Sequence, residues 1–185
     1  MIILGSSYFH FTEQQPEKVY IERVIDGDTV VTAAGDSIRL LGIDTPEIDW
    51  ENNDSEFYAE EAREFTIKHL DQQTVLLEFD KEREDSYGRT LAYIYRDGQN
   101  FNQQLLEEGY ASLMIVEEND KYESEFKNAA AEARESGRGV WSQITQLEKS
   151  LPVISYQQAE LFRGEVVIVE GEIVNTAAAD SANFL

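Results

Sequence analysis

The order of apolar and polar positions along the chain predicts a succession of short strands. Lys18–Val31 alternates loosely and is rich in Val, Ile and Tyr, so we predict a strand there, with a partner strand that runs back to Ile43. Three further runs of β type follow, at Thr74–Phe79, Thr90–Tyr95 and Tyr110–Val116. Five short strands at these spacings favour a small barrel.

Helical periodicity is found in three segments between these strands. They cover about residues 55–70, 101–108 and 122–135. Asp54 or Ser55 is expected to cap the first helix, and Gly109 to end the second. The whole pattern predicts an α+β fold that is mainly β: a five-stranded OB-fold barrel with three packed helices, followed by a C-terminal β segment.

The chain is expected to divide into four parts. Residues 1–17 are polar and aperiodic and are predicted to form a flexible leader, before a barrel domain at 18–142. Residues 143–152 are predicted to be a linker, and 153–185 to be a partial second β module of OB-like character. Because a single β ribbon is marginal by itself, we expect this last part to pack on the barrel or to belong to a longer parent protein.

Composition limits the class of protein. Of the 185 residues 42% are hydrophobic, which is enough for a real core, and cysteine is absent, so disulfides and thiolate metal sites are excluded. No apolar run reaches the roughly 18 residues of a membrane helix, so no membrane partner is expected. The first residues lack the basic region of a signal peptide. We expect a monomer that is secreted or lies at the cell surface, and a cytoplasmic location stays open as the alternative.

The charge of the chain is strongly acidic. Thirty-seven acidic residues against 15 basic ones give a net charge of −22, the wrong sign for a protein that coats nucleic acid without specificity. A highly soluble surface and adaptation to a salty medium both explain this charge. Neither interpretation excludes an enzyme whose active site carries its own cation.

One predicted hairpin gathers carboxylates. Its turn is expected at Ala34-Gly35-Asp36, so that antiparallel pairing places Asp26 and Asp28 beside Asp44 and Glu47. Four carboxylates in one place are costly unless a cation lies among them. Ligand sets made only of oxygen favour Ca²⁺ or Mg²⁺ over zinc or copper. The hairpin therefore predicts a site for a hard cation.

Two arginines indicate which reaction this site could catalyse. Arg39 lies within the hairpin and Arg89 opens a later strand, and arginine forks match phosphate oxygens. Glu47 is placed to orient or deprotonate water, so the implied chemistry is metal-assisted phosphodiester hydrolysis. Each part also has an ordinary explanation by itself: the DGDT sequence is common in turns, and Arg39 could be a plain salt-bridge partner. The combination is more specific than any one part.

These residues carry a family resemblance. The segments IDGDT, RLLGIDTPE and DSYGRTLAYIY, followed by FNQQLLEEGYA, are similar to the staphylococcal nuclease (thermonuclease) family over roughly Lys18 to Ser142. The resemblance implies an OB barrel with three helices and a Ca²⁺-dependent, sequence-nonspecific endonuclease. Such an enzyme cleaves DNA and RNA, single-stranded or frayed regions preferred, to 3′-phosphate ends.

The resemblance also implies a role for each site residue. Asp28, Asp44 and the carbonyl of Thr45 would bind one Ca²⁺ ion, with Asp26 near the metal but not bound to it. Glu47 would be the general base, Arg39 and Arg89 would act in catalysis and bind phosphate, and Tyr87 would contact the nucleotide.

The chain departs from the prototype of this family outside those residues. Ser86 replaces a lysine that touches substrate phosphate, and Ile115 and Glu117 align with tyrosines of the nucleotide pocket. The prototype is also basic, whereas this chain is acidic. We therefore expect weaker binding that depends more on metal and on ionic conditions. The alternatives are a catalytically weak or inactive nuclease-like module that binds nucleic acid or protein, and an acidic mimic of DNA.

Overall fold

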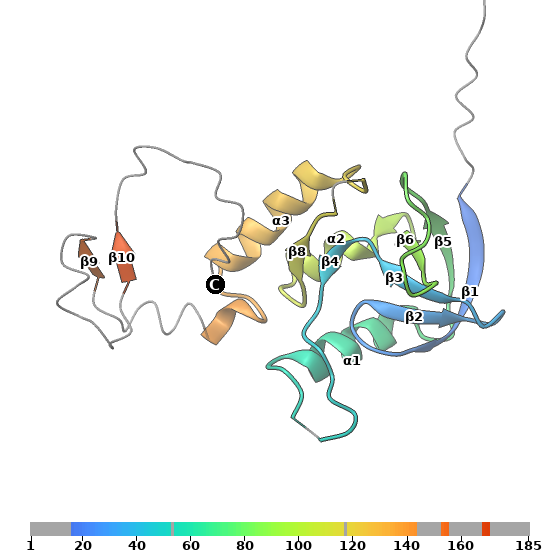
Figure 1. Ribbon diagram of the computed structural model, residues 1–185, viewed down its shortest axis with the longest axis horizontal. Coiled ribbons are helices and arrows are strands. Elements are labelled where there is room, and N and C mark those ends of the chain that lie inside the picture. The colour runs from blue at the N-terminus through green and yellow to red at the C-terminus, as the bar shows by residue number, and fades with distance from the viewer. Residues whose placement is uncertain (1–15, 53, 117, 144–152, 156–167, 171–185) are drawn as a thin grey trace, which may run out of the picture. The chain divides into compact units, whose positions relative to one another are not determined.

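The computed structural model describes residues 16–143, apart from 53 and 117, together with 153–155 and 168–170. The chain divides into two units, Met1–Ser142 and Gln143–Leu185 (Figure 1). In the second unit, β9 (Val153–Ser155) and β10 (Ile168–Glu170) pair in parallel. The predicted leader lies outside the described residues except at its end, where β1 begins, and so do most of the linker and of the C-terminal module.

Five strands of the first unit form a closed barrel, which confirms the predicted fold class. The strands are β1 (Glu17–Val24), β2 (Thr29–Thr32), β3 (Ser37–Leu40), β5 (Thr74–Glu78) and β6 (Thr90–Arg96). They are hydrogen-bonded in the order β3-β2-β1-β5-β6, and a parallel pairing of β3 with β6 closes the circle. Strand β7 (Gln99–Asn100) only extends β6. Closure leaves no free edge within the barrel.

A two-stranded ribbon lies beside the barrel. Strand β4 (Gly42–Asp44) pairs with β8 (Ser112–Met114) and not with the barrel strands. The chain leaves β3 at Leu41 and turns at Gly42, whose φ is +79°. A side-chain carbon at that position would lie 2.6 Å from the ring of Phe126, so glycine is required both by the backbone angle and by the packing.

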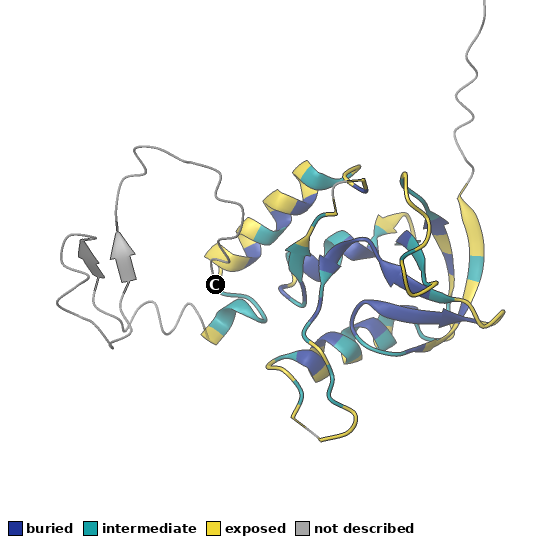
Figure 2. Ribbon diagram, viewed as in Figure 1, coloured by how far each residue is buried: buried dark blue, intermediate teal, exposed yellow. Residues whose placement is uncertain are grey.

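Three helices cover the barrel and the ribbon. They are α1 (Ala59–Leu70), α2 (Phe101–Glu107) and α3 (Glu123–Glu135). Figure 2 shows β2 and β3 buried, whereas α3 has one buried and one exposed face. The buried core is formed by strand residues together with apolar side chains of the helices, including Leu70, Phe101, Leu105, Leu106 and Phe126. Among the described residues, no helix is both long and apolar enough to cross a membrane.

Several element boundaries differ from the prediction. The run Lys18–Val31 is two strands, because the chain turns at 25–28, where the amide of Asp28 donates to the carboxylate of Asp26 over 3.1 Å. The fifth barrel strand comes from this split. The predicted strand at Tyr110–Val116 is instead β8, in the ribbon.

The first helix also begins later than predicted. Neither Asp54 nor Ser55 caps it; Tyr58 occupies the N-cap position with a left-handed backbone and no side-chain cap. The reason is local, because the loop before the helix closes on itself through Glu47 and Glu56 and delays the first turn. The ends of α1 near Asp71 and of α2 before Gly109 are as predicted.

Candidate active site

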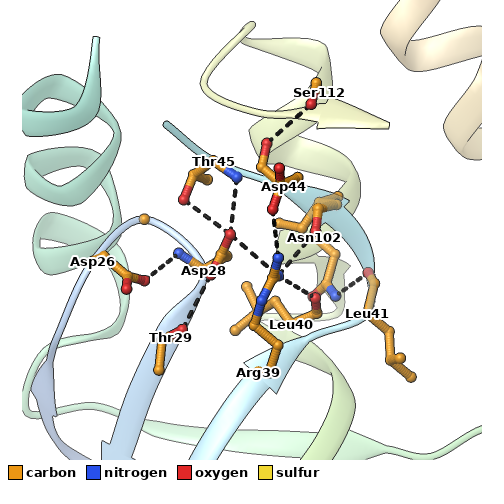
Figure 3. A network of polar contacts seen from close by, with 12 residues as sticks. Asp26, Asp28, Thr29, Arg39, Leu40, Leu41, Asp44, Thr45, Asn102 and Ser112 are labelled. Atoms are coloured by element: carbon orange, nitrogen blue, oxygen red, sulfur yellow. Dashed lines mark hydrogen bonds and ion pairs between the residues drawn. The ribbon is translucent and has the colours of Figure 1, made fainter. Parts of the chain in front are cut away.

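The β2–β3 hairpin and the start of the ribbon bring the predicted acidic ends together. Asp28 precedes β2 and Thr45 follows β4, and they meet in the structure (Figure 3). The Thr45 amide and hydroxyl both donate to Oδ2 of Asp28, over 2.8 and 3.0 Å, and Thr29 donates to Oδ1 over 3.1 Å. The Asp28 carboxylate is thus buried and fixed on both of its oxygens.

Arg39 lies between the two predicted metal-binding aspartates. Its Nη1 is 3.1 Å from Oδ2 of Asp28, and its Nη2 is 2.8 Å from Oδ1 of Asp44. Nη1 also donates to the carbonyls of Leu40 and Ile43, each over 2.9 Å. The guanidinium is therefore almost completely buried and holds both sides of the bend between β3 and β4 (Figure 3).

A buried asparagine holds the same bend from the other side. Asn102, in α2, donates to the carbonyl of Leu41 over 2.8 Å and accepts from the amide of Ile94 over 3.0 Å. It is fully buried, so these bonds replace those that water would make. The bend that carries Asp44 and Thr45 is therefore fixed by the barrel and by α2 together.

Helix α1 supports the turn that carries Asp28. Arg63 donates from Nε to the carbonyl of Ile25 over 2.9 Å, and Thr66 donates to the carbonyl of Gly27 over 2.7 Å. Gly27 packs so tightly against Thr45 that an added side-chain carbon would lie 2.7 Å from the threonine side chain. The lack of a side chain at Gly27 thus permits the contact between Asp28 and Thr45.

Glu47 lies just beyond this cluster, on an exposed segment. Its amide donates to Oε2 of Glu56 over 2.9 Å, and its carbonyl accepts from the Glu56 amide over 3.0 Å. These bonds fix the Glu47 backbone. Its carboxylate is left at the surface beside Asp28 and Asp44, the groups whose charges act on it.

The carboxylates of the site resist ionisation. Desolvation raises the pKa of Asp28, Asp44 and Glu47 above the ordinary values, and repulsion from neighbouring carboxylates adds to the effect. The Arg39 guanidinium opposes this increase at each of the three without cancelling it. The charge of Arg39 therefore does not offset the burial and the mutual repulsion of these carboxylates.

Arg89 and Tyr87 face the same cavity as Arg39. This cavity has a volume of about 320 Å³, and its lining includes Arg39, Tyr87 and Arg89. Asp85 holds Arg89: its Oδ2 lies 2.7 Å from Nε, and its Oδ1 accepts from the Arg89 amide over 2.9 Å. The Tyr87 side chain is 84% exposed, and the Arg89 guanidinium lies 5.6 Å from its ring centre. An exposed ring and two arginines around one cavity suit a nucleotide and its phosphate.

The donor set fits a calcium ion. Asp28 and Asp44 can supply carboxylate oxygens and Thr45 a carbonyl oxygen, and Ca²⁺ accepts such oxygens together with water. Among the described residues there is no cluster of three or more His, Cys, Asp or Glu side chains that could hold a metal. The proposed set has only two carboxylate side chains and one backbone carbonyl, so water would complete the coordination.

The structure thus assembles most of the predicted site, but it also contains residues that the sequence did not indicate. It brings Asp28, Arg39, Asp44 and Thr45 into direct contact, with Glu47 beside them, and places Arg89 and Tyr87 at the cavity that Arg39 also lines. The supporting residues that were missed are Gly27, Glu56, Arg63, Thr66, Asp85 and Asn102. Asp85 could have been indicated by its place at the start of a turn, where an aspartate often accepts from the amide two residues later; the others act over long sequence distances.

Comparison with known proteins gives a consistent set of matches. The family model described as "Staphylococcal nuclease homologue" matches residues 37–143. A thermonuclease of Staphylococcus intermedius is 39% identical over 133 residues, which are 70% of this chain and 79% of that protein. A thermonuclease of Staphylococcus hyicus is 38% identical over 130 residues, 68% of this chain and 77% of that protein. The SPbeta prophage-derived endonuclease YokF of Bacillus subtilis is 41% identical over 129 residues, 67% of this chain and 44% of that protein.

Proposed function

Because the chain belongs to the staphylococcal nuclease family and is a phosphodiester-cleaving hydrolase, we propose that it is a Ca²⁺-dependent, sequence-nonspecific endonuclease. It hydrolyses DNA and RNA to 3′-phosphate ends. The observation that carries this proposal is the position of Arg39, which bonds both Asp28 and Asp44 and lines a cavity with Arg89. A carboxylate pair and two arginines at one cavity suit a phosphodiester and a cation.

Asp28, Asp44 and the Thr45 carbonyl would hold the calcium ion. When bound, Ca²⁺ neutralises the carboxylates and polarises a phosphate oxygen. The carboxylates now engage Arg39. With their charge compensated by the metal, Arg39 has donors available for phosphate. The metal and the substrate would therefore bind cooperatively.

The arginines would stabilise the charge that develops on the phosphate. Arg39 is nearly buried, so its charge acts with little screening by water. Arg89 is oriented by Asp85 and is more exposed. Two cations on one phosphate lower the energy of the five-coordinate transition state, in which negative charge is concentrated on the phosphate oxygens.

Glu47 would take the proton of the attacking water. A new bond forms between the water oxygen and phosphorus, and the bond from phosphorus to the 5′-oxygen breaks. The 5′-oxygen takes up a proton from solvent and leaves as a hydroxyl group, and the 3′-phosphate remains. The raised pKa of Glu47 makes its carboxylate a better base than an ordinary glutamate.

Two observations favour the alternative of a weak or inactive nuclease-like module. Both arginines already have carboxylate partners, and the chain carries a net charge of −22. If the metal does not displace these pairs, the site would bind nucleic acid or protein without turnover.

A metal-dependence assay separates the two. The purified chain is mixed with single-stranded DNA and Ca²⁺, with EGTA and the Glu47→Gln variant as controls, and the product ends are tested for 3′-phosphate. We expect cleavage that EGTA abolishes, and a rate at least about 100-fold lower for Glu47→Gln, by comparison with other lost catalytic groups. Absence of EGTA-sensitive cleavage would contradict the proposal, and retention of most activity by Glu47→Gln would contradict the role of Glu47.

A further inference from the structure

The loop between β4 and α1 carries an exposed tryptophan close in sequence to Glu47 of the candidate active site. Trp50 follows Glu47 by three residues and is 64% exposed to solvent. The loop extends from the barrel beyond the beginning of α1 (Figure 1). A large apolar ring in water is unfavourable, and it is informative when it lies near a binding site.

Hydrogen bonds within the loop hold Trp50 on an ordered backbone. Glu47 and Glu56 close the base of the loop by two bonds, and the Asp49 amide donates to Ser55 over 3.1 Å. The Asp49 carboxylate in turn accepts from the amides of residues 51 and 52, over 2.9 and 2.8 Å. The backbone on both sides of Trp50 is therefore restrained, which reduces the entropy lost when a ligand packs on the ring.

Arg63 connects Trp50 to the turn that carries Asp28. Its guanidinium carbon lies 5.3 Å from the centre of the Trp50 ring, and its Nε donates to the carbonyl of Ile25 over 2.9 Å. The pair repeats the arrangement of Tyr87 and Arg89 at the cavity. The site thus has two exposed aromatic rings, each beside an arginine, on segments that adjoin its carboxylates.

The charge of the loop selects which part of a nucleic acid can lie there. Five carboxylates fall within residues 47–56, at positions 47, 49, 51, 54 and 56. They would repel a phosphate group, whereas a base is uncharged and has a π face. Base stacking on aromatic side chains is the common mode for single strands. The arginines of the cavity would take the phosphate, and Trp50 a neighbouring base.

We propose that Trp50 is a base-stacking residue that gives the enzyme a preference for single-stranded nucleic acid. In a duplex both faces of each base are covered by neighbouring bases, so the ring can stack only on a single strand or a frayed end. This inference rests on the proposed nuclease function for its substrate. It assigns a binding residue on the Glu47 side of the site.

Tryptophan fluorescence tests the contact directly. The chain has two tryptophans, so Trp141→Phe leaves Trp50 as the only reporter. Measurements use the full chain with Glu47→Gln and Ca²⁺ present, so that the oligonucleotide remains intact. We expect a thymidine decamer to quench the emission, and a decamer of abasic sites, with the same phosphates, not to do so. Equal quenching by both oligonucleotides, or no change with either, would overturn the inference.

Nucleic-acid binding and cleavage by the Trp50→Ala variant give a second readout that does not depend on Trp141→Phe. Trp50→Ala should bind a labelled single strand about 5- to 100-fold more weakly, in line with the loss of one stacked base. The slope of log Kd against log salt should stay unchanged, because no phosphate contact is removed. Trp50→Phe should restore part of the affinity. Tyr20→Ala removes another exposed ring, on β1, and should bind like the wild type.

The ratio of single-strand to duplex cleavage completes the test. For Trp50→Ala it should fall towards one, with duplex cleavage little changed. Equal loss on both substrates would assign Trp50 a structural role instead. Ca²⁺-dependent cleavage with an unchanged ratio would overturn this inference but not the nuclease. Base-dependent quenching without any cleavage would overturn the nuclease but not the stacking role.

Discussion

At the scale of single residues, the site combines unfavourable charges with one buried cation. Arg39 bonds two aspartates and two carbonyls. The pKa values of Asp28, Asp44 and Glu47 are nevertheless raised. The arrangement is therefore costly until more positive charge arrives. The proposed Ca²⁺ ion would supply that charge.

This cost predicts the effect of Asp44→Asn on stability. Desolvation and the charge of Asp28 raise the pKa of Asp44 in the folded protein. The free energy of unfolding therefore falls as the pH rises from the pKa of Asp44 in the unfolded chain through its pKa in the folded protein. The amide keeps an oxygen that Arg39 can bond. Without Ca²⁺ at pH 7, the variant should melt at the same or a higher temperature than the wild type, and this difference should disappear in acid.

Thermal melting with and without Ca²⁺ measures both the destabilisation caused by Asp44 and the stabilisation caused by the bound ion. Saturating Ca²⁺ should raise the Tm of the wild type and raise that of Asp44→Asn much less, because binding to the folded state is what stabilises it. Asp36→Asn, a change at the hairpin turn, serves as the control and should respond to Ca²⁺ like the wild type. A clear loss of stability for metal-free Asp44→Asn would show that the Arg39 pair outweighs the repulsion.

At the scale of elements, the site depends on close approach between segments far apart in sequence. The turn at 25–28 is held by α1 from one side and by Thr45 from the other. The strip of chain at 78–82 is joined to the start of α3 in a similar way, through Glu78, Tyr122 and Asn119. Each junction can be tested by one small change.

Gly27→Ala should separate the turn from Thr45. The added carbon would lie 2.7 Å from the threonine side chain, so one of the two must move and the bonds to Asp28 must lengthen. We expect a loss of about 1–3 kcal/mol in stability, and a fall in kcat/KM measured well below the Tm.

Gly35→Ala is the control for Gly27→Ala, because it strains the backbone without displacing any residue of the site. At Gly35 the φ of +93° is strained for alanine, but an added carbon meets nothing within 4 Å. This variant should lose stability and keep its activity at low temperature. If Gly27→Ala behaved in the same way, the close contact with Thr45 would not be needed for catalysis.

Tyr122→Phe should loosen the junction of α3 with β5. The Tyr122 hydroxyl donates to Glu78 over 2.8 Å and accepts from Tyr95 over 2.8 Å, so the change removes one hydrogen bond from each of two partly buried groups. A cost of about 1–3 kcal/mol in the free energy of unfolding is expected from denaturant titration. Tyr20→Phe is the matched control, because Tyr20 is more exposed, and should cost under about 0.5 kcal/mol. Equal losses of unfolding free energy in the two variants would show that the hydrogen bonds of Tyr122 add nothing to stability.

At the scale of the whole molecule, the charge of −22 opposes the approach of a polyanion. The repulsion acts over a Debye length, which is about 10 Å at 0.1 M salt. The attraction of Arg39 and Arg89 acts at contact and is less exposed to screening. Salt should therefore relieve the repulsion before it weakens the binding.

Steady-state kinetics can measure this balance. With saturating Ca²⁺, kcat/KM on single-stranded DNA should rise severalfold as NaCl increases from about 10 to 150 mM. A dinucleotide substrate, with one phosphodiester, should respond far less. A steady decrease with salt for the long substrate, as for a basic nucleic-acid-binding protein, would contradict the prediction.

The sequence by itself determined the hairpin, the acids at its two ends, Arg39 between them and the fold class. These follow from local rules, because alternation, turn residues and charge spacing act over a few residues. It did not show that Arg63 and Thr66, about forty residues later, hold the turn that breaks the strand at Lys18–Val31. Nor did it show that the strand after Tyr110 pairs with β4 outside the barrel. Those features are decided by packing between distant segments, and so is the support that holds Asp28 against Thr45.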